Sequence, residues 1–596
     1  MPYRPGDLSD RSIIIRMTGA LCTQPTQIFQ TPIATQVIQR FIGRLQARES
    51  AMLALFSGLE VTGDDNDISE AALSLTRVLG LLVDLEPEQI RMKAPDVSDL
   101  VCDPEALARL VERLYDHWRT YERYLIFEGG ADESRDRALE GHVSFVHSND
   151  DLNRLVRDAY QRILHNLRGV WPRVYRQVPS GANMSLLTDT VPWQCPEGPY
   201  NMLRDIRMVR LALMVPPVVL YPLMNRRQGQ FEKVDHNPLE RVIIDPTRWL
   251  CIPLRVGPLN MLVFVDRDYL CHAVSLLNLF ELSGHNEARE KPDGVLVFGV
   301  PSGALQGNPT VFYEDESNDV ALGVIARSDN VDYLGYLKKM LLTLHNVVMM
   351  RRGRMPIHGA MCKLSLKRGL TRNVVIVGDS GAGKSETIEA FRTLADEAIS
   401  DLTIIFDDMG SLELRADGAL AGYGTEVGAF VRLDDLDPGY AFGRIDTSVL
   451  INPHRQNARV VIPLTDYEEV VAGYPVDMLL YANNYEKIDE EHPALEFAAS
   501  CEEILDVFRQ GCRRAKGTSD ESGLVQTYFG NPFGPSQLRH RHEPIAERFF
   551  DAALAAGVRV GQLRTQLGIP GMEREGPLTA ARALFQQMRD AGRPAE

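Results

Sequence analysis

Cysteine is scarce in this sequence, and its cysteines never occur at the spacing of a metal-binding or redox motif. There are eight cysteines in 596 residues, and no two form a Cys-x-x-Cys pair. They are Cys22, Cys102, Cys195, Cys251, Cys271, Cys362, Cys501 and Cys512. Scattered thiols in a large chain are typical of a reduced cytosolic protein, so the pattern argues against a disulfide framework and against a cysteine-based zinc site.

Long hydrophobic runs are also missing. The most apolar stretch, residues 208–224, contains Arg210 and three prolines, so it is too short and too interrupted to span a bilayer. Residues 1–12 are polar and lack the apolar core of a signal peptide. We therefore expect a cytoplasmic protein with no membrane partner.

The sequence has no excess of basic residues. Its net charge is −17, so no global positive field attracts nucleic acid, and we expect no nucleic-acid partner. Hydrophobic residues make up 44% of the chain and charged residues 24%, which is ordinary for a globular protein with a sizeable core. We interpret the negative charge as a solubility feature.

Two patterns of apolar residues divide the chain. Residues 36–56 and 106–127 have apolar side chains at helical spacing, which predicts a mainly helical N-terminal region. Farther along, short apolar runs bounded by turn residues predict strands, and they include ERVIIDP, LNMLVFVD and DGVLVFGV (240–246, 259–266 and 293–300). Helices and strands then alternate to about residue 570, which favours an α/β fold with mixed sheets.

A glycine-rich turn gives the strongest functional indication. Residues 378–385, GDSGAGKS, match the pattern G-x-x-x-x-G-K-[ST], with a β-branched run before them (373–377) and an amphipathic helical pattern after them (385–395). In such a P-loop, backbone N–H groups and a helix N-terminus surround phosphate oxygens, the lysine reaches the β- and γ-phosphates, and the hydroxyl ligates Mg²⁺. The predicted nucleotide-binding residues are Gly378, Ser380, Gly381, Ala382, Gly383, Lys384 and Ser385.

A second apolar run, LTIIF (402–406), ends at Asp407 and Asp408. A carboxylate at the end of a strand beside a P-loop is where Mg²⁺ needs a second anchor. We therefore predict Asp407 and Asp408 as metal-site residues.

The segment before the P-loop resembles the ATP-dependent phosphoenolpyruvate carboxykinase family. That family has Tyr-x-Gly-Glu-Met-Lys-Lys, a helix, and then Met-His-Cys-Ser-Ala-Asn ahead of its own P-loop. In DYLGYLKKMLLTLHNVVMMRRGRMPIHGAM (332–361) the matching positions are Tyr333, Gly335, Lys338, Lys339, Asn346 and His358. Farther on, NARVVIP (457–463) places Arg459 at the family's catalytic arginine, and TYFGNPFGPS (527–536) resembles Cys-Phe-Gly-Ala-Pro-Phe. The P-loop itself is more similar to that of bacterial HPr kinase/phosphorylase, a smaller relative.

The resemblance implies a fold and a division of roles. It implies a P-loop nucleotide- and metal-binding lobe (341–596), an α/β substrate lobe (171–340) and, before them, the helical region (1–170) of unknown role. A lysine, a histidine and an aspartate would hold Mn²⁺, which here means Lys339, His358 and Asp408. Ser385 and Asp407 would serve Mg²⁺ and its water shell. Lys338, Lys339 and Arg459 would neutralise a transferring phosphoryl group near Tyr333.

Substrate recognition departs from the family pattern. The Arg-Ser-Pro-Lys-Asp segment that binds the family's carboxylic acid substrate is not found in residues 1–330, and Arg248 and Arg255 are candidate replacements. On the adenine side, Arg574 fits only approximately, and Ala581 stands where threonine is expected.

Three functions therefore remain open. The first is ATP- and metal-dependent phosphoryl transfer to an acceptor other than oxaloacetate, either a small metabolite or a protein hydroxyl. The second is a true carboxykinase, which converts oxaloacetate and ATP to phosphoenolpyruvate, CO₂ and ADP. The third is a non-catalytic nucleotide-binding regulator, with the N-terminal helices as a surface for a protein partner or for self-association.

Overall fold

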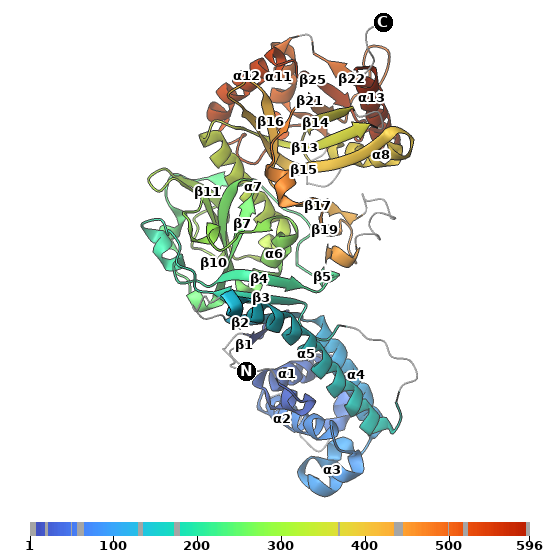
Figure 1. Cartoon of the computed structure of the whole chain (residues 1–596). Coiled ribbons are helices and arrows are strands. Elements are labelled where there is room, and N and C mark those ends of the chain that lie inside the picture. Colours follow the sequence, from blue (N-terminus) through green and yellow to red (C-terminus); the bar gives the residue numbers. More distant parts are fainter. Residues whose placement is uncertain are drawn as a thin grey trace. The chain divides into compact units, whose positions relative to one another are not determined.

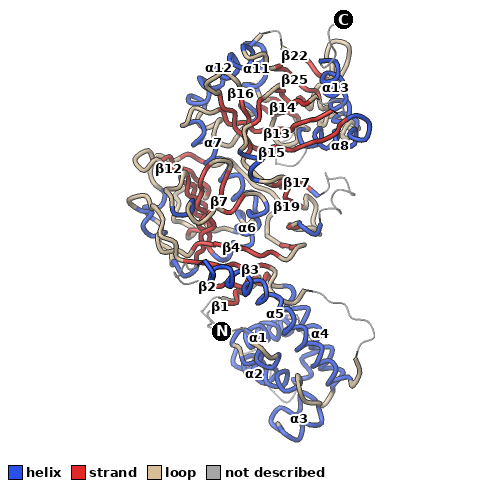
Figure 2. The backbone as a smooth tube through the Cα atoms, in the orientation of Figure 1, coloured by secondary structure: helices blue, strands red, loops and turns tan. Residues whose placement is uncertain are grey.

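The protein is a mixed α/β structure with several sheets, and the chain forms two compact units (Figures 1 and 2). Unit 1 comprises residues 1–190 and 209–218, and unit 2 comprises residues 191–208 and 219–596. This computed structural model describes residues 7–17, 22–48, 50–56, 65–128, 135–171, 179–366, 370–433, 445–498, 500–515 and 523–591. The division into three parts at residues 170 and 340 stays a prediction.

Unit 1 combines helices with parallel strands. Its helices are α1 (Pro32–Ala47), α2 (Asp65–Leu82), α3 (Pro87–Lys93), α4 (Pro104–Thr120) and α5 (Arg135–Arg168). Its strands are β1 (Ser12–Met17), β2 (Glu122–Glu128), β3 (Met184–Asp189) and β4 (Met208–Met214), and β5 (Val218–Leu220) follows at the boundary between the units. Strand β2 pairs in parallel with β1 on one side and with β3 on the other.

The expectation of a mainly helical N-terminal region was therefore wrong in part. The helical pattern over 106–127 ends at Thr120, and the residues after it form β2. Tyr124, Leu125 and Ile126 are buried one after another, as in a strand covered on both faces. A short apolar run of this kind has no period that distinguishes strand from helix, and its pairing with β1 and β3 decides the outcome.

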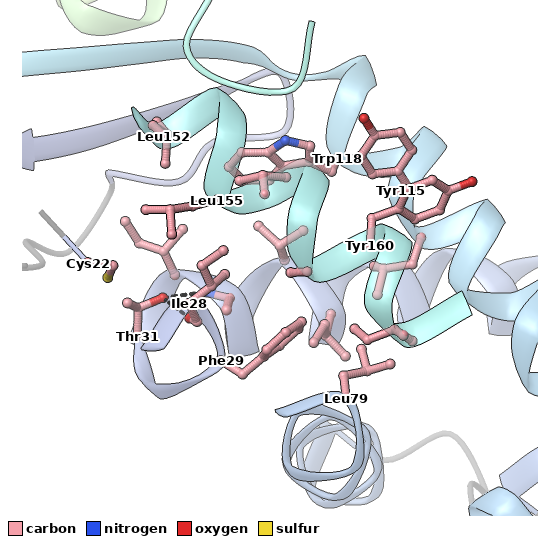
Figure 3. A pocket seen from close by; sticks show the side chains of 18 of the residues that line it. Cys22, Ile28, Phe29, Thr31, Leu79, Tyr115, Trp118, Leu152, Leu155 and Tyr160 are labelled. Carbon is pink, nitrogen blue, oxygen red and sulfur yellow. Dashed lines mark hydrogen bonds between the residues drawn. The ribbon is translucent and has the colours of Figure 1, made fainter. Parts of the chain in front are cut away.

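The helices of unit 1 line a partly open apolar cavity of about 140 Å³ (Figure 3). Its wall includes Phe29, Leu79, Leu155 and Trp118, together with the stacked pair Tyr115 and Tyr160. The indole N–H of Trp118 donates to the Ser180 carbonyl instead of to the cavity. The cavity thus offers a ligand or a water molecule few polar partners.

In its described residues, unit 2 contains two larger sheets and two smaller ones. The first large sheet runs in the order β7-β8-β10-β12-β11-β6, with β9 beside β7, and its central strands β8, β10 and β12 are parallel. The strands are β6 (Glu232–Lys233), β7 (Trp249–Val256), β8 (Leu259–Asp266), β9 (Glu281–Leu282), β10 (Gly294–Val300), β11 (Thr310–Asp315) and β12 (Val320–Ala326). Two of the three predicted strands, β8 and β10, are confirmed.

The predicted strand ERVIIDP does not form. Pro238–Arg241 is a 3₁₀ turn, and the next strand begins only at Trp249. Ile243 is 87% exposed, so the run does not bury the side chains that a strand in this sheet requires.

The second large sheet carries the P-loop. Its order is β20-β16-β15-β13-β14-β21-β25-β22, and it mixes parallel and antiparallel pairs. The strands are β13 (Met355–Leu366), β14 (Thr371–Val377), β15 (Ile399–Leu414), β16 (Leu420–Gly424), β20 (Tyr474–Pro475), β21 (Met478–Asn483), β22 (Leu495–Phe497) and β25 (Arg559–Arg564). Helices α8 (Lys384–Ala398) and α13 (Glu575–Ala591) pack together on one face of this sheet, shown in Figure 1. The strand–loop–helix order predicted around residues 373–395 is confirmed.

The remaining elements of unit 2 are short sheets and helices. Strands β17 (Gly428–Arg432), β19 (Arg459–Pro463) and β18 (Val449–Ile451) are neighbours in a small sheet, and β23 (Cys512–Arg514) pairs with β24 (Leu524–Gln526). The other helices are α6 (Leu270–Ser275), α7 (Leu334–Arg351), α10 (Tyr467–Val471), α11 (Cys501–Gln510) and α12 (Arg539–Ala555). Among the described helices, none is long and apolar enough to cross a membrane.

Helix α7 positions the site. It contacts β10 and β12 of the first large sheet as well as β13 and β15 of the second. Its side chains are therefore buried almost all round, including Lys338, which is only 1% exposed. Charged groups on such a helix need partners inside the protein.

The cavity in unit 1 leads to a first prediction. Ala34 lines it from α1, and Ala34→Leu should raise the free energy of unfolding by about 1–2 kcal/mol by filling part of the empty volume. Urea unfolding followed by circular dichroism and tryptophan fluorescence measures the change.

The matched control is Ala72→Leu. Ala72 is fully buried on α2 but does not line the cavity, so the same three added carbons should destabilise the protein by about 1–3 kcal/mol. Equal effects of the two substitutions would contradict the presence of the cavity.

Candidate functional site

A cleft of about 490 Å³ in unit 2 brings the predicted site residues together. Its lining comes from the loop 226–230, the start of α7, the P-loop, β15, the β17–β19 pair and the segment 527–533. The predicted residues that line it are Tyr333, Lys338, Lys339, Ser380, Gly381, Lys384, Ser385, Asp407, Asp408 and Arg459. Gly378, Ala382, Gly383 and His358 lie directly behind this surface, as the contacts below show.

The P-loop has a backbone shape that only glycine adopts easily. Strand β14 enters the loop, and α8 begins at Lys384, so the loop lies at the positive end of a helix. Gly381 and Gly383 have φ values of +77° and +97°. A Cβ atom on Gly383 would lie 2.5 Å from the hydroxyl oxygen of Thr565, so a larger residue does not fit there.

Contacts with the rest of unit 2 and within the loop hold it in shape. The hydroxyl of Thr565, just after β25, donates to the Ala382 carbonyl at 2.7 Å, and the amide of Asn484, just after β21, donates to the Gly381 carbonyl at 2.8 Å. The Gly378 N–H donates to the His358 carbonyl at 2.9 Å. Lys384 Nζ donates to the Asp379 carbonyl at 3.0 Å. The shape of the loop is thus built into the fold.

The hydroxyl of Ser385 meets the carboxylate of Asp407. Ser385 Oγ donates to Asp407 Oδ1 at 2.7 Å. Burial raises the pKa of Asp407, and the Ser385 hydrogen bond opposes that shift. A hydroxyl and a carboxylate at this distance are hard oxygen ligands of the type that Mg²⁺ selects.

Asp408 has a strained backbone at the centre of the site. Its φ is +133°, which a residue with a side chain rarely adopts and which costs about 1–3 kcal/mol. Strand pairing sets Asp408 opposite Gly359 and therefore next to His358, whose Nε2 lies 3.0 Å from Asp408 Oδ1. Strain of this kind at a cleft wall supports a functional role for Asp408.

The two lysines of α7 converge on the same carboxylate. Lys339 Nζ lies 2.7 Å from both oxygens of Asp408. Lys338 Nζ lies 2.6 Å from Asp408 Oδ2 and 3.0 Å from Glu426 Oε1. Glu426 is almost fully buried, so Lys338 bridges two carboxylates inside the protein.

The two lysines differ in their protonation. Burial lowers the pKa of Lys339 to about 8, more than Asp408 can offset. Burial acts on Lys338 as well, but Asp408 and Glu426 together outweigh it and raise its pKa. Burial also raises the pKa of Glu426 to about 8, against the effect of Lys338. Lys338 is therefore the charged counter-ion of the cluster, whereas Lys339 can release its proton to become a metal ligand.

The donor atoms of His358 and Asp408 fit a cation. The Gly530 carbonyl can only accept, so His358 Nδ1, 2.7 Å away, carries the ring proton. Burial lowers the pKa of His358, which favours the neutral ring and points its Nε2 lone pair at Asp408 Oδ1. Two acceptors at 3.0 Å need a proton or a metal ion between them. Among the described residues, no three His, Cys, Asp or Glu side chains form a metal-binding group, so a cation bound by His358 and Asp408 would need Lys339 as a further ligand.

Arginines occupy the cleft wall that faces α7. Arg459 on β19 is directly opposite Arg432 on β17, and both line the cleft with Arg226 and Arg227. Burial raises the pKa of Tyr333, while the positive charges of Arg459, Lys338 and Arg227 oppose the shift, so these three cations lie around its ring. Within the described part of the chain, Arg459 Nε is buried without a hydrogen-bond partner.

The loop of Arg226 and Arg227 is anchored to the strand of Arg459. The Asn457 side chain donates to the Asn225 carbonyl at 2.8 Å, and the Asn225 side chain donates to the Gln456 carbonyl at 2.9 Å. The Arg227 guanidinium lies 5.3 Å from the centre of the Phe533 ring, and Lys339 Nζ lies 4.6 Å from the same ring. Arg227 is thus fixed close to the cluster on Asp408.

Three predicted residues do not reach the cleft. Arg248, a candidate anion binder, pairs with Asp266 and Asp268, and Arg255 bonds the Tyr467 hydroxyl and the Pro258 carbonyl. Both arginines therefore have structural partners, and this role as anion binders was wrong. Arg574 is exposed just before α13 and is not part of the cleft wall, so its role in adenine binding stays a prediction.

Several site residues were missed in the sequence. They are Arg226, Arg227, Asp379, Glu426, Arg432 and Arg513. Asp379 stands inside the P-loop motif itself and could have been found there. The others lie far from the recognised motifs, and no local pattern distinguishes them from ordinary surface charges.

Comparisons with known proteins give no family assignment. No protein-family model matches the chain, and no curated protein matches it at a significant level. Functional inference therefore depends on the geometry of the cleft.

The buried cluster leads to a second prediction. Lys338→Met leaves Asp408 and Glu426 without their shared counter-ion and should lower the free energy of unfolding by about 3–5 kcal/mol. Adding Glu426→Gln should change this loss little near pH 7, because Glu426 has a pKa of about 8 and is then already largely protonated. Chemical denaturation measures both variants.

Lys291→Met is the control. Lys291 pairs with Asp319 at the surface, and its loss should cost less than about 1 kcal/mol. If Lys338→Met is no more damaging than Lys291→Met, the buried charge cluster does not stabilise the fold.

Proposed function

We propose that this chain catalyses divalent-metal-dependent transfer of the ATP γ-phosphoryl group to a small acceptor other than oxaloacetate. One observation carries the proposal: the P-loop serine is bonded to Asp407, while Lys339 and His358 meet the neighbouring Asp408, all at one cleft. Phosphoryl transfer depends mainly on positioning and on neutralising charge, and the cleft supplies groups for both.

Each group has a role that follows from its place. The loop N–H groups and Lys384 bind the phosphate chain at the start of α8. Ser385 and Asp407 would hold Mg²⁺, and Lys339, His358 and Asp408 would hold Mn²⁺. A bound metal would supply positive charge to the phosphate oxygens. Lys338 keeps Asp408 ionised and in place, and Arg459 lies where it can neutralise the transferring group.

The arginine wall supports an anionic acceptor. Arg226, Arg227, Arg432 and Arg459 add positive charge to the cleft wall, and Arg227 and Arg459 lie near Tyr333. Guanidinium groups bind carboxylates and phosphates in two-point contacts. This favours a small anionic metabolite over a protein hydroxyl as the acceptor.

Oxaloacetate is the second candidate acceptor. The missing Arg-Ser-Pro-Lys-Asp segment argued against it, but Arg226 and Arg227 place guanidinium groups in the cleft by another route. A true carboxykinase is therefore the alternative enzyme. A non-catalytic nucleotide-binding regulator is the third candidate function. The strained backbone and the clustered charges around Asp408 argue against it.

The first experiment measures products directly. Purified protein is incubated with ATP, Mg²⁺, Mn²⁺ and oxaloacetate, with Lys384→Ala as the blank, and phosphoenolpyruvate is assayed. A signal above the blank establishes the carboxykinase and refutes another acceptor as the main one. Without a signal, small carboxylates and phosphate esters are screened for label from [γ-³²P]ATP. ATP binding with no transfer to any acceptor and no hydrolysis would overturn the enzymatic proposal.

A third prediction separates nucleotide and metal roles. Lys384→Ala should weaken ATP binding at least about tenfold and abolish turnover, because its ammonium group contacts the phosphates. His358→Ala should leave ATP affinity within about threefold while raising the Mn²⁺ concentration required for turnover, because one metal ligand is lost. Isothermal titration with ATP, with and without Mn²⁺, measures the difference. Equal loss of ATP binding in both variants would contradict the two roles.

A fourth prediction concerns the acceptor. Arg227→Gln should raise the KM for the acceptor found in the first experiment at least about tenfold, because a charged hydrogen bond is lost, and leave the KM for ATP within about twofold. Steady-state kinetics with each substrate varied in turn gives both constants. Arg241→Gln is the control, since Arg241 is exposed outside the cleft and should change neither. If the KM for ATP rises more than the KM for the acceptor, Arg227 does not bind the acceptor.

A further inference from the structure

The P-loop contains a carboxylate where an anion must bind. Asp379 is the second residue of the loop, lines the cleft and is only 5% exposed. A buried negative charge beside a phosphate site repels the phosphates unless a cation compensates for it. The loop itself contributes Lys384, but Lys384 is needed for the phosphates.

Arg513 is that compensating cation. It lies on β23, far from the loop in sequence, and its Nε donates to Asp379 Oδ2 at 2.8 Å. Both side chains are more than nine-tenths buried, so water screens the pair little. The next residue, Arg514, also connects β23 to the loop. Its N–H donates to the Asn484 side chain, and the Asn484 amide donates to the Gly381 carbonyl of the loop.

Asp379 also connects the loop to the metal-side histidine. Its Oδ2 accepts from the Thr527 hydroxyl at 3.3 Å, and its Oδ1 lies 3.6 Å from His358 Nδ1. Gly530 accepts the proton of that same nitrogen. A Cβ on Gly530, which has φ +57°, would lie 2.7 Å from the Asp379 N–H nitrogen, so backbone packs against backbone here.

We propose that the Asp379–Arg513 pair is a positioning device that couples the phosphate-binding loop to the orientation of His358. Arg513 cancels the charge of Asp379 and ties the loop to β23, while the carboxylate of Asp379, 3.6 Å from the His358 N–H that Gly530 accepts, favours the ring orientation in which Nε2 faces Asp408. Both residues act through the loop and the histidine. The inference depends on the proposed function in one respect: the loop must bind a nucleotide phosphate chain.

The proposal predicts opposite effects of Asp379→Asn on binding and on turnover. Removing the negative charge should tighten ATP binding by about three- to tenfold, since a like charge beside the phosphates is lost. Turnover should fall at least about tenfold, because the negative charge that favours this orientation of the His358 ring is lost. A purely structural role predicts that both quantities worsen.

Arg513→Gln should have the complementary effect. It leaves Asp379 uncompensated and should weaken ATP binding at least about tenfold, with a much smaller loss for AMP, which carries less phosphate charge. The double variant Asp379→Asn/Arg513→Gln should recover ATP affinity to within about threefold of the wild type but remain slow in turnover. Asp477→Asn is the control, because Asp477 bonds the Asn373 N–H near the other end of β14 and should leave ATP affinity unchanged.

Isothermal titration of the full chain with ATP and AMP, together with product assays, distinguishes the outcomes. Wild-type protein that binds no ATP overturns the proposed function itself. Wild-type protein that binds ATP, with Asp379→Asn weakening ATP and AMP equally, overturns this inference alone. Failure of the double variant to recover ATP affinity overturns it as well, and thermal unfolding shows whether each variant is folded.

Discussion

The neutralisation of Asp408 is the interaction on which the rest of unit 2 depends. Its carboxylate is contacted by Lys338 and Lys339 from α7 and by His358 from β13, and it lies on β15 with a strained backbone. Ionised groups in such surroundings are tolerated only when they are fully partnered. Helix α7 must therefore sit between the two large sheets in one register, because a rotation of one residue would carry both lysines away from Asp408.

The same constraint determines which charges meet in the cleft. Asp407 and Asp408 lie within β15 beside the P-loop, where metal ions and phosphates are expected in the proposed function. The arginines of the loop 226–230 and of the β17–β19 pair line the same cleft, and Arg227 and Arg459 lie near Tyr333. A phosphoryl group transferred in this cleft would stay close to positive charge, which is the main requirement of such a transfer.

Local motifs in the sequence predicted part of this arrangement well. The strand before the glycine-rich loop and the helix after it are confirmed. The strand predicted over 402–406 is present, but its predicted end was wrong, because β15 continues through Asp407 and Asp408 to Leu414. Predictions that depended on one segment's pattern alone were less secure. The apolar residues after Thr120 form β2 because two neighbouring strands pair with them, and ERVIIDP forms no strand because Ile243 stays exposed. Arg248 and Arg255 were predicted as anion binders, but in the structure they bond Asp266 and Tyr467 outside the cleft.

By itself the sequence determined the elements whose information is local: a glycine-rich loop between a strand and a helix, and the strand that carries the paired aspartates. It also determined that lysines and a histidine occur at a spacing similar to that of a known phosphotransferase family. Only the tertiary structure decided which distant charges share the cleft. Arg227 and Arg513 reach it through contacts between segments more than 100 residues apart, as in the bond from Arg513 to Asp379, and Glu426 lies buried against Lys338. Such contacts depend on burial and on charge balance in three dimensions, and neither quantity is a property of any single stretch of sequence.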